Sequence, residues 1–288
     1  MKMMTKAFSI AAVTAVAAFS GIAFAAGGGK TDSNYKMKHP HWHFTGFTGS
    51  YDKEAAQRGY QVYREVCASC HALEHLSFRH LGDKGAPFYN ADYPNPNDNP
   101  FVKAFAADWS ITDIDGETGD EIERPGTPAD KFPPIYANDG LARGSNGGAL
   151  PPDLSVIVKA RAGGADYIYN LLVAYETAMP EGMQMAEGFS YNPVFEGGAI
   201  AMAAPLSEGI IEYAARDVDD GHGNITSVPA PEATVEQMAK DVTEFLAWAA
   251  DPKMEARKQT GLGAMIYLLI LSILLWLSYK RVWRDVKH

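Results

Sequence analysis

Apolar and small residues recur every three or four positions between residues 52 and 66, which is the spacing of one face of an α-helix. Ser50 or Asp52 can accept hydrogen bonds from the amides of the first turn and so cap this helix. Gly59 lies in its middle, where glycine costs about 1 kcal/mol relative to alanine. We therefore predict a helix over residues 52–66 that a second helix crosses closely at Gly59. The repeating positions are Ala56, Gly59, Tyr60, Tyr63 and Val66.

A second amphipathic helix is predicted over residues 234–250. Thr234 and Gln237 have the spacing of a capping box, and Asp251-Pro252 ends the pattern. Its apolar face makes this helix the candidate for the crossing partner at Gly59. The apolar positions are Val235, Met238, Val242, Phe245, Leu246 and Ala249.

The chain between these two helices is predicted to contain long irregular segments. Residues 82–100 are punctuated by proline and glycine, and residues 180–209 show no helical period. Asp153 can cap a short helix that Gly163-Gly164 ends, and another helix is expected from about residue 166 to 177. The expected fold class is therefore mainly α, with long loop insertions.

Both ends of the chain differ from its centre. Residues 1–25 combine a basic start, an apolar run and an Ala-x-Ala site, which predicts a cleaved signal peptide. Residues 259–279 carry no charge and, at 1.5 Å per residue, span roughly 32 Å as a helix, enough to cross a bilayer. We expect an exported, periplasmic domain over 26–258, one transmembrane helix over 259–279 and a cytoplasmic tail over 280–288, whose basic residues agree with the positive-inside rule.

The formal net charge of −10 understates how acidic the exported part is. The first 25 residues contribute +2 and residues 280–288 contribute +3, so residues 26–279 carry −15. Such a charge disfavours nucleic acid and anionic lipid as partners and favours a basic protein. Residues 108–123 hold seven acidic and no basic residues, so we expect a solvated loop there. A solubilising surface and a docking patch for a basic redox partner are equally compatible with it.

Cys67, Cys70 and His71 form a C-x-x-C-H motif, which is the attachment sequence for c-type haem. The two thiols can form thioethers with the haem vinyl groups, and the adjacent imidazole can bind the iron. A zinc site is disfavoured, because the chain has only these two cysteines. A redox dithiol is disfavoured as well, because no βαβ pattern surrounds the motif. We therefore predict one covalently attached haem c.

The segment 26–50 is rich in glycine and histidine, and two hypotheses for its structure are considered. Three histidines at alternate positions suggest a metal site, but no cysteine or carboxylate lies nearby in the sequence. We favour an extended segment that lies on the body and buries its aromatic side chains. The histidines are His39, His41 and His43, and the aromatic residues are Trp42, Phe44 and Phe47.

The ligand opposite His71 decides what a haem iron can do. A vacant position favours gas binding or peroxide chemistry, whereas a methionine thioether raises the potential and restricts the iron to electron transfer. Met179 precedes a proline, and Met202 lies among small residues that allow close approach to a porphyrin. His222 is a further possibility, and the residues alone do not choose between the two methionines.

The ordered motifs of the chain resemble the cytochrome c1 family. They are 58–63 before C-x-x-C-H, Asn-Gly-Gly-Ala-Leu-Pro-Pro-Asp-Leu-Ser at 146–155, Lys-Ala-Arg-Ala-Gly-Gly at 159–164, Tyr-Asn-Pro at 191–193, and 239–250 before the apolar span. The resemblance covers nearly the whole chain after the predicted signal peptide. It implies a class I cytochrome c-like domain with long loop insertions.

The resemblance also implies roles for individual residues. The family's iron-binding methionine, in a Met-x-Pro-Pro stretch, corresponds to Met202, although this chain has Met-Ala-Ala-Pro and so lacks one proline. The implied metal ligands are therefore His71 and Met202. Further haem contacts are implied for Asn146, Pro151, Pro152 and Tyr167, and for Arg161, which is suited to pair with a propionate.

In function, the resemblance implies the haem subunit of the quinol–cytochrome c reductase, or cytochrome bc1, complex. Such a subunit passes electrons from the Rieske iron–sulfur protein to a soluble or tethered cytochrome c and performs no bond-making catalysis itself. The implied partners in the membrane are cytochrome b and the Rieske protein, in a dimeric complex. The implied location is a bacterial inner membrane, with the haem domain in the periplasm. A gas-binding haem protein and a free-standing electron shuttle are the competing hypotheses.

Overall fold

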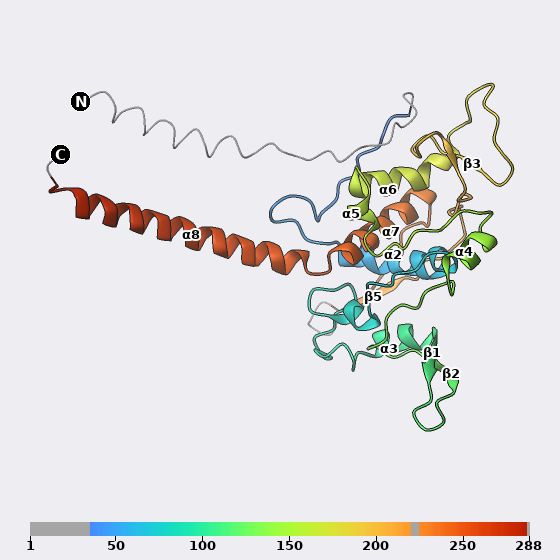
Figure 1. The fold of residues 1–288 in the computed structure, drawn as a ribbon, viewed down its shortest axis with the longest axis horizontal. Helices are drawn as coiled ribbons and strands as arrows, with labels where there is room; N and C mark the ends of the chain where they lie inside the picture. Colours follow the sequence, from blue (N-terminus) through green and yellow to red (C-terminus); the bar gives the residue numbers. More distant parts are fainter. Residues whose placement is uncertain (1–34, 220–224, 287–288) are drawn as a thin grey trace.

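A computed structural model describes residues 35–219 and 225–286. It consists of a mainly helical body and one long C-terminal helix that extends away from it (Figure 1). The predicted signal peptide over 1–25 and His222 lie outside the described residues. The α-helices are α2 (Lys53–Glu65), α3 (Pro100–Ala107), α4 (Asp139–Ser145), α5 (Ile157–Ala160), α6 (Gly164–Val173), α7 (Val235–Ala250) and α8 (Met254–Trp283).

Short elements fill the connections between these helices. Three 3₁₀ turns are present in the described ranges: η1 (Cys67–Ser69), η2 (Phe78–Gly82) and η3 (Ala174–Glu176). The strands form antiparallel pairs, which are β1 (Ser110–Ile114) with β2 (Glu121–Pro125), β3 (Ser190–Tyr191) with β4 (Ala199–Ile200), and β5 (Arg216–Asp219) with β6 (Ile225–Val228). The predicted mainly α fold class is therefore confirmed, whereas α3 and α4 were not expected from the sequence.

The crossing of α2 and α7 organises the core (Figure 1). A β-carbon on Gly59 would collide with the backbone carbonyl of Asp241 and with the side chain of Phe245. The carboxylate of Asp52 caps α2, and the hydroxyl of Thr234 caps α7, because each accepts a backbone amide of the first turn. Both predicted helices and their close crossing at Gly59 are confirmed.

An ion pair lies inside this helix crossing. Arg58 donates from Nε and Nη2 to the two carboxylate oxygens of Asp241, at 2.8 Å each. The Asp241 side chain is fully buried, and that of Arg58 is 25% exposed. The buried Asp241 carboxylate requires the Arg58 partner, because loss of the guanidinium would leave a buried negative charge without compensation.

The segment before α2 lies on α6, as the extended reading predicts. The indole of Trp42 is buried and donates from Nε1 to the carboxylate of Asp166 at 2.6 Å. The second carboxylate oxygen lies 2.7 Å from Nδ1 of His39, so folding supplies the acidic partner that is absent from the local sequence. No group of three metal-ligating side chains occurs in the described residues. Phe47 was expected to be buried, but it is 53% exposed.

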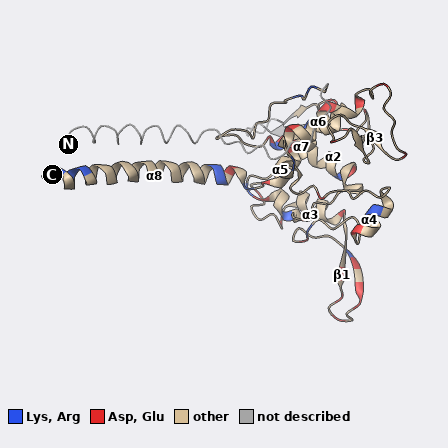
Figure 2. Cartoon of the chain, turned by 45° about the horizontal axis from the view of Figure 1, so that its top comes forward, with Lys and Arg blue, Asp and Glu red and all other residues tan. Residues whose placement is uncertain are grey.

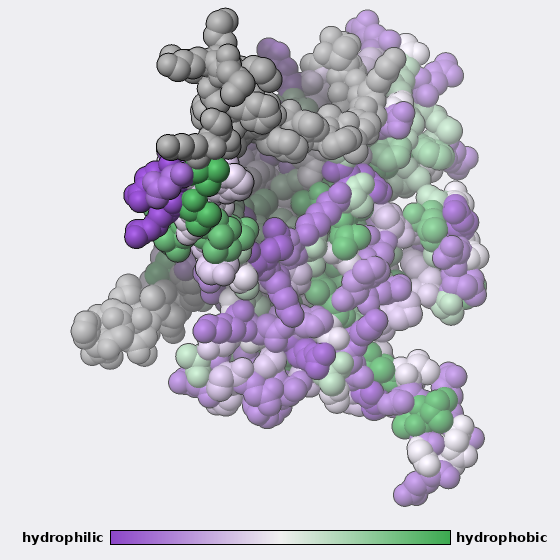
Figure 3. All heavy atoms as spheres, turned by 60° about the vertical axis from the view of Figure 1, so that its left-hand side comes forward, coloured by the Kyte–Doolittle hydropathy of each residue, from purple (hydrophilic) through white to green (hydrophobic). Residues whose placement is uncertain are grey.

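The predicted loop at 108–123 is wrong, because this stretch contains the β1–β2 hairpin. The hairpin forms an arm that projects from the body, and Figure 3 shows apolar side chains on it beside hydrophilic ones. Ile114 and Ile122 are its exposed apolar residues. The β-branched residues Ile111, Thr112 and Ile114 of β1 favour a strand, but the many acidic residues obscured that signal.

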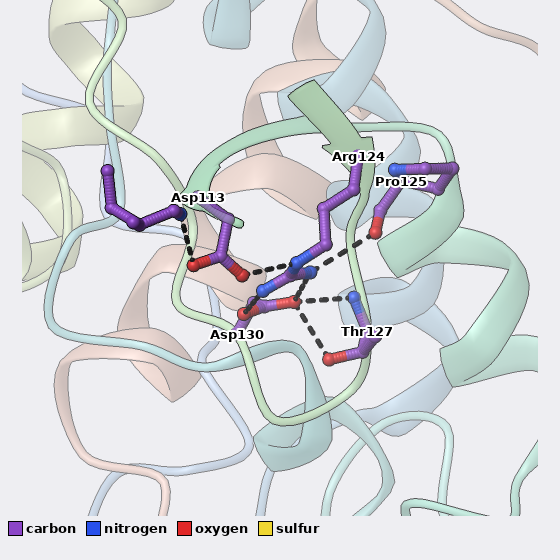
Figure 4. Close-up of polar contacts among 6 residues, drawn as sticks. Asp113, Arg124, Pro125, Thr127 and Asp130 are labelled. Atoms are coloured by element: carbon purple, nitrogen blue, oxygen red, sulfur yellow. Dashed lines mark hydrogen bonds and ion pairs between the residues drawn. The ribbon is translucent and has the colours of Figure 1, made fainter. Parts of the chain in front are cut away.

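A basic residue just beyond the acidic run braces the base of this arm. Arg124 bonds Asp113 at 2.6 Å and Asp130 at 2.7 and 2.9 Å (Figure 4). Thr127 donates to Asp130 from its amide and its hydroxyl. The Arg124 guanidinium holds the pKa of Asp130 far below its ordinary value, so this carboxylate stays charged. Within this arm, the acidic residues at the tip, Asp115, Glu117, Asp120 and Glu121, make no ion pair with the described basic residues, whereas Asp113 and Asp130 do.

Helix α8 is, within the part of the chain that the structure describes, the one helix long and apolar enough to cross a membrane. Its most apolar window has a mean hydropathy of 2.2, and none of that window is buried against the body. Basic residues lie at both ends of the helix (Figure 2). The helix extends beyond the predicted span of 259–279 in both directions. Its first turns, before residue 259, contact the body.

Candidate functional site

The C-x-x-C-H motif follows directly after α2 and forms one tight turn. The amides of Cys70 and His71 both donate to the carbonyl of Cys67, at 3.1 and 2.9 Å. No disulfide joins the two cysteines. The hydroxyl of Tyr63, on the buried face of α2, donates to the carbonyl of His71 at 3.1 Å. The helix crossing and the motif are therefore held as one unit.

The imidazole of His71 is oriented by the backbone of a distant segment. Its Nδ1 lies 2.8 Å from the carbonyl oxygen of Pro152. A carbonyl only accepts hydrogen bonds, so Nδ1 carries the proton and Nε2 presents a lone pair. Burial lowers the pKa of His71, although the bond to Pro152 and the nearby charge of Asp153 oppose this. The ring is therefore neutral at neutral pH and suited to bind a metal through Nε2.

Three further bonds run between the residues after His71 and the residues after Pro152. The amide of Leu154 donates to the carbonyl of Ala72 at 2.9 Å. The amide of Glu74 donates to the Asp153 carboxylate at 2.8 Å, and that of His75 to the Ser155 hydroxyl at 3.1 Å. Together they fix Pro152 beside the motif.

The predicted cap at Asp153 is wrong. Its second carboxylate oxygen accepts the amide of Ser155, so both oxygens serve the turn and neither caps α5. Val156 occupies the N-cap position and provides no side-chain hydrogen bond. Residues 153–155 instead bind the segment that follows His71. The Pro151-Pro152 turn therefore lies farther from α5 than the sequence suggests.

The pKa of the Cys67 thiol argues against the two competing hypotheses for the cysteine pair, a zinc site and a redox dithiol. Burial, and to a lesser extent the nearby Cys70, raises the pKa of its thiol to about 12. Reactive dithiols and zinc-binding thiolates need the opposite shift. No zinc-type ligand cluster is present in residues 35–219 or 225–286.

Met202 and Met179 differ in their surroundings. Met202 is half-buried, and its carbonyl accepts the Tyr175 hydroxyl at 2.9 Å, which ties its loop to η3. The side chain of Met179 is 46% exposed. His80 is engaged locally, because its Nδ1 accepts the amide of Ser77. These contacts favour Met202 as the held methionine, and its role as a ligand stays a prediction.

The remaining predicted haem contacts lie on three elements. Asn146 follows α4 and donates to the carbonyl of Ala142 at 2.7 Å. Arg161 follows α5, is exposed, and makes no ion pair with the carboxylates that the structure describes. Tyr167, on α6, is half-buried. Burial raises its pKa, although the charge of Arg161 lowers it. The structure thus places Arg161 and Tyr167 within electrostatic reach of each other.

Sequence reasoning missed several side chains that support this site: Tyr63, Ser155 and Tyr175. Each acts through a hydrogen bond to a backbone group that is distant in sequence or belongs to another element. Periodicity marks Tyr63 as a core residue, which it also is, and gives no sign of the bond to His71. No local pattern marks the other two.

A mainly helical body, an apolar terminal helix and a C-x-x-C-H turn with an oriented histidine define the class of membrane-associated c-type cytochromes. Comparison with known proteins narrows this class. Residues 42–286 match the model of the cytochrome C1 family. The chain therefore belongs to the cytochrome c1 family, which confirms the resemblance found in its sequence.

Relatives from bacteria and plants agree with this assignment. The chain is 36% identical to "Cytochrome c1" of Rhodospirillum rubrum over 93% of this chain and 96% of that protein. It is 39% identical to "Cytochrome c1-1, heme protein, mitochondrial" of Solanum tuberosum over 96% of this chain and 78% of that protein. It is 42% identical to "Cytochrome b/c1" of Bradyrhizobium diazoefficiens over 85% of this chain, but only 35% of that longer protein.

The family implies a haem cofactor, and the residues present fit one. Two thiols that no disulfide joins lie on a single turn, which is what thioether formation needs. His71 offers one free ring nitrogen, Leu150 leaves 38% of its apolar surface exposed beside the two prolines, and Arg161 is a cation without a carboxylate partner among the described residues. An apolar ring with acidic propionates matches this set.

Proposed function

We propose that this protein is the haem subunit of a quinol–cytochrome c reductase and binds one covalent haem c. Cys67 and Cys70 would form the thioethers, and His71 and Met202 would bind the iron. The observation that carries the proposal is the 2.8 Å bond between Nδ1 of His71 and the carbonyl of Pro152. It fixes the tautomer and the ring orientation that an iron ligand requires.

The chain's own residues hold and tune the redox centre. When bound, haem supplies a one-electron couple. Pro151 and Pro152 stiffen the turn that orients His71. Asn146, Arg161 and Tyr167 would contact the haem, and Arg161 would pair with a propionate. As an iron ligand, the Met202 thioether would close the iron to small molecules and raise the reduction potential, which suits electron transfer.

The proposed partners follow from the family and from charge. Electrons arrive from the Rieske iron–sulfur protein and leave to a soluble or tethered cytochrome c, within a dimeric complex. The Bradyrhizobium relative is named for both cytochromes, which supports cytochrome b as the partner of α8. We place residues 26–258 in the periplasm of a bacterium, residues 259–279 in its inner membrane and residues 280–288 in the cytoplasm.

Purification in mild detergent tests this proposal. The expected result is a chain whose intact mass includes one haem, a low-spin six-coordinate spectrum, and co-purification of a b-type cytochrome. The reduced protein should not bind carbon monoxide, because a thioether-closed iron resists it. A chain without attached tetrapyrrole overturns the proposal, and rapid carbon monoxide binding favours a gas-binding protein instead.

A further inference from the structure

The junction between α7 and α8 is only three residues long, from Asp251 to Lys253. Pro252 fixes one backbone angle, but each remaining residue keeps soft torsions, so the chain alone does not set the angle between the two helices. Figure 1 shows α8 leaving the body at this junction as one straight helix. A small change at its base would therefore move the body appreciably relative to the far end of α8.

One carboxylate at this junction joins three elements. Asp251 accepts hydrogen bonds from Nζ of Lys159 on α5 at 2.8 Å and from Nη2 of Arg257 in the first turn of α8 at 2.5 Å. Its side chain is 15% exposed. Burial alone raises the pKa of Asp251, but the bonds from Lys159 and Arg257 outweigh it and lower the pKa below its ordinary value. The carboxylate is therefore charged at neutral pH.

The segment before α2 supplies further contacts to the base of α8. Glu255 accepts the amide of Tyr51 at 2.9 Å. Lys258 donates to the carbonyls of Phe44 and Gly49 at 2.7 and 3.0 Å. The Asp251 network and these contacts involve different parts of the body, so together they restrict rotation of α8 about its short linker.

The partner of Asp251 on the body belongs to the segment that surrounds the haem site. Lys159 is two residues before Arg161 and seven residues after Pro152, whose carbonyl orients His71. The base of the membrane helix is thus connected to the haem-binding segment through a single ion-paired side chain. Electron transfer depends on the separation of donor and acceptor, so this connection bears on function.

We propose that Asp251 is a positioning residue that fixes the angle between α8 and the haem-binding segment, and thereby the orientation of the haem relative to the membrane. The inference rests on the proposed function, because it assumes a haem at His71 and a membrane around α8. Asp251 acts through its ion pairs with Lys159 on α5 and Arg257 on α8.

Electron paramagnetic resonance of the full-length protein in oriented membrane multilayers tests this inference. The wild type should show a low-spin haem signal with a sharp dependence on the angle between field and membrane. Asp251→Ala and Lys159→Met should broaden that dependence. Asp285→Asn is the matched control, since Asp285 is exposed and pairs with Arg284 at 3.2 Å beyond the far end of α8. Equal sharpness in Asp251→Ala and wild type overturns the inference.

Amide hydrogen exchange of the same samples gives a readout that does not need haem. Loss of the carboxylate should speed amide exchange both at residues 254–258 and at residues 157–160. The expected increase is about tenfold, because two partly exposed ion pairs no longer oppose local opening. Unchanged exchange in both segments of Asp251→Ala overturns the inference. A wild type without a haem signal overturns the proposed function instead, and the exchange data then still decide whether Asp251 fixes α8.

Discussion

Gly59 of α2 and Asp241 of α7 approach so closely that the Asp241 backbone carbonyl occupies the space of a β-carbon on Gly59. Gly59→Ala should therefore push the helices apart rather than gain the usual helix propensity of alanine. Overpacking of this kind typically costs about 1–3 kcal/mol. The free energy of unfolding of the full-length protein in detergent, measured by denaturant titration, should fall by such an amount.

Gly144 provides the control for this substitution. It also lies in a helix, α4, but nothing lies within 4 Å of the position of its β-carbon. Gly144→Ala should leave stability unchanged or raise it slightly. Equal effects of the two substitutions would show that the crossing tolerates a methyl group and that the packing argument is wrong.

The helix crossing was predictable because its signals are local. Gly59 interrupts a periodic helix, and Thr234 caps another, so both helices and the reason for their contact follow from short stretches. Asp153 was misread because its hydrogen-bond partner, the amide of Glu74, is 79 positions away. A residue that can cap a helix can equally bind any exposed amide that folding brings near, and sequence does not distinguish the two.

The hairpin and the site show the same limit. Acidic residues in 108–123 indicated solvent, which is correct for most of them, but Arg124 lies one position beyond that stretch and pairs two carboxylates at the base. For the site, the motif gave Cys67, Cys70 and His71 directly. The orientation of His71 depends on Pro152, and only the family resemblance pointed to that region.

Met202→Leu tests the second axial ligand. Leucine preserves volume and apolarity but has no sulfur lone pair, so the reduction potential should fall, the haem should become five-coordinate or bind water, and carbon monoxide should now bind. Potentiometric titration and carbon monoxide difference spectra measure these changes. Met179→Leu is the matched control and should behave as wild type, because Met179 is largely exposed. The reverse pattern would transfer the ligand role to Met179.

The acidic tip of the β1–β2 hairpin should steer a basic redox partner. Neutralising Asp115, Glu117, Asp120 and Glu121 together should lower the rate of cytochrome c reduction at low salt and flatten its dependence on ionic strength, because exposed charges are screened beyond about 10 Å at 0.1 M salt. Glu123→Gln is the control on the same arm, since Glu123 already accepts bonds from Ser110 and Thr112. An unchanged salt slope in the fourfold variant would reduce the tip to a solubilising surface.

Glu244 should make the stability of the body depend on pH. Its side chain is buried in α7 and accepts the Asp52 amide at 2.9 Å. Burial raises its pKa from 4.5 to about 7, although the bond from Asp52 opposes this, and the charges of Asp52 and Asp241 add to the rise. The folded state thus binds the proton more tightly than the unfolded state does. The resulting stabilisation is complete below pH 4.5 and is lost as the pH rises through 7.

Glu244→Gln removes this titration while keeping an oxygen for the Asp52 amide. The variant and the wild type should differ little at pH 5, and the variant should be more stable at pH 8, by up to about 3 kcal/mol for a shift of this size. Thermal unfolding of both proteins across this range measures the difference. Glu236 is an exposed position on the same helix. Glu236→Gln should therefore change the stability by the same amount at pH 5 and at pH 8. Parallel pH profiles for wild type and Glu244→Gln would mean that Glu244 stays ionised inside the fold, held by the Asp52 amide and Lys240.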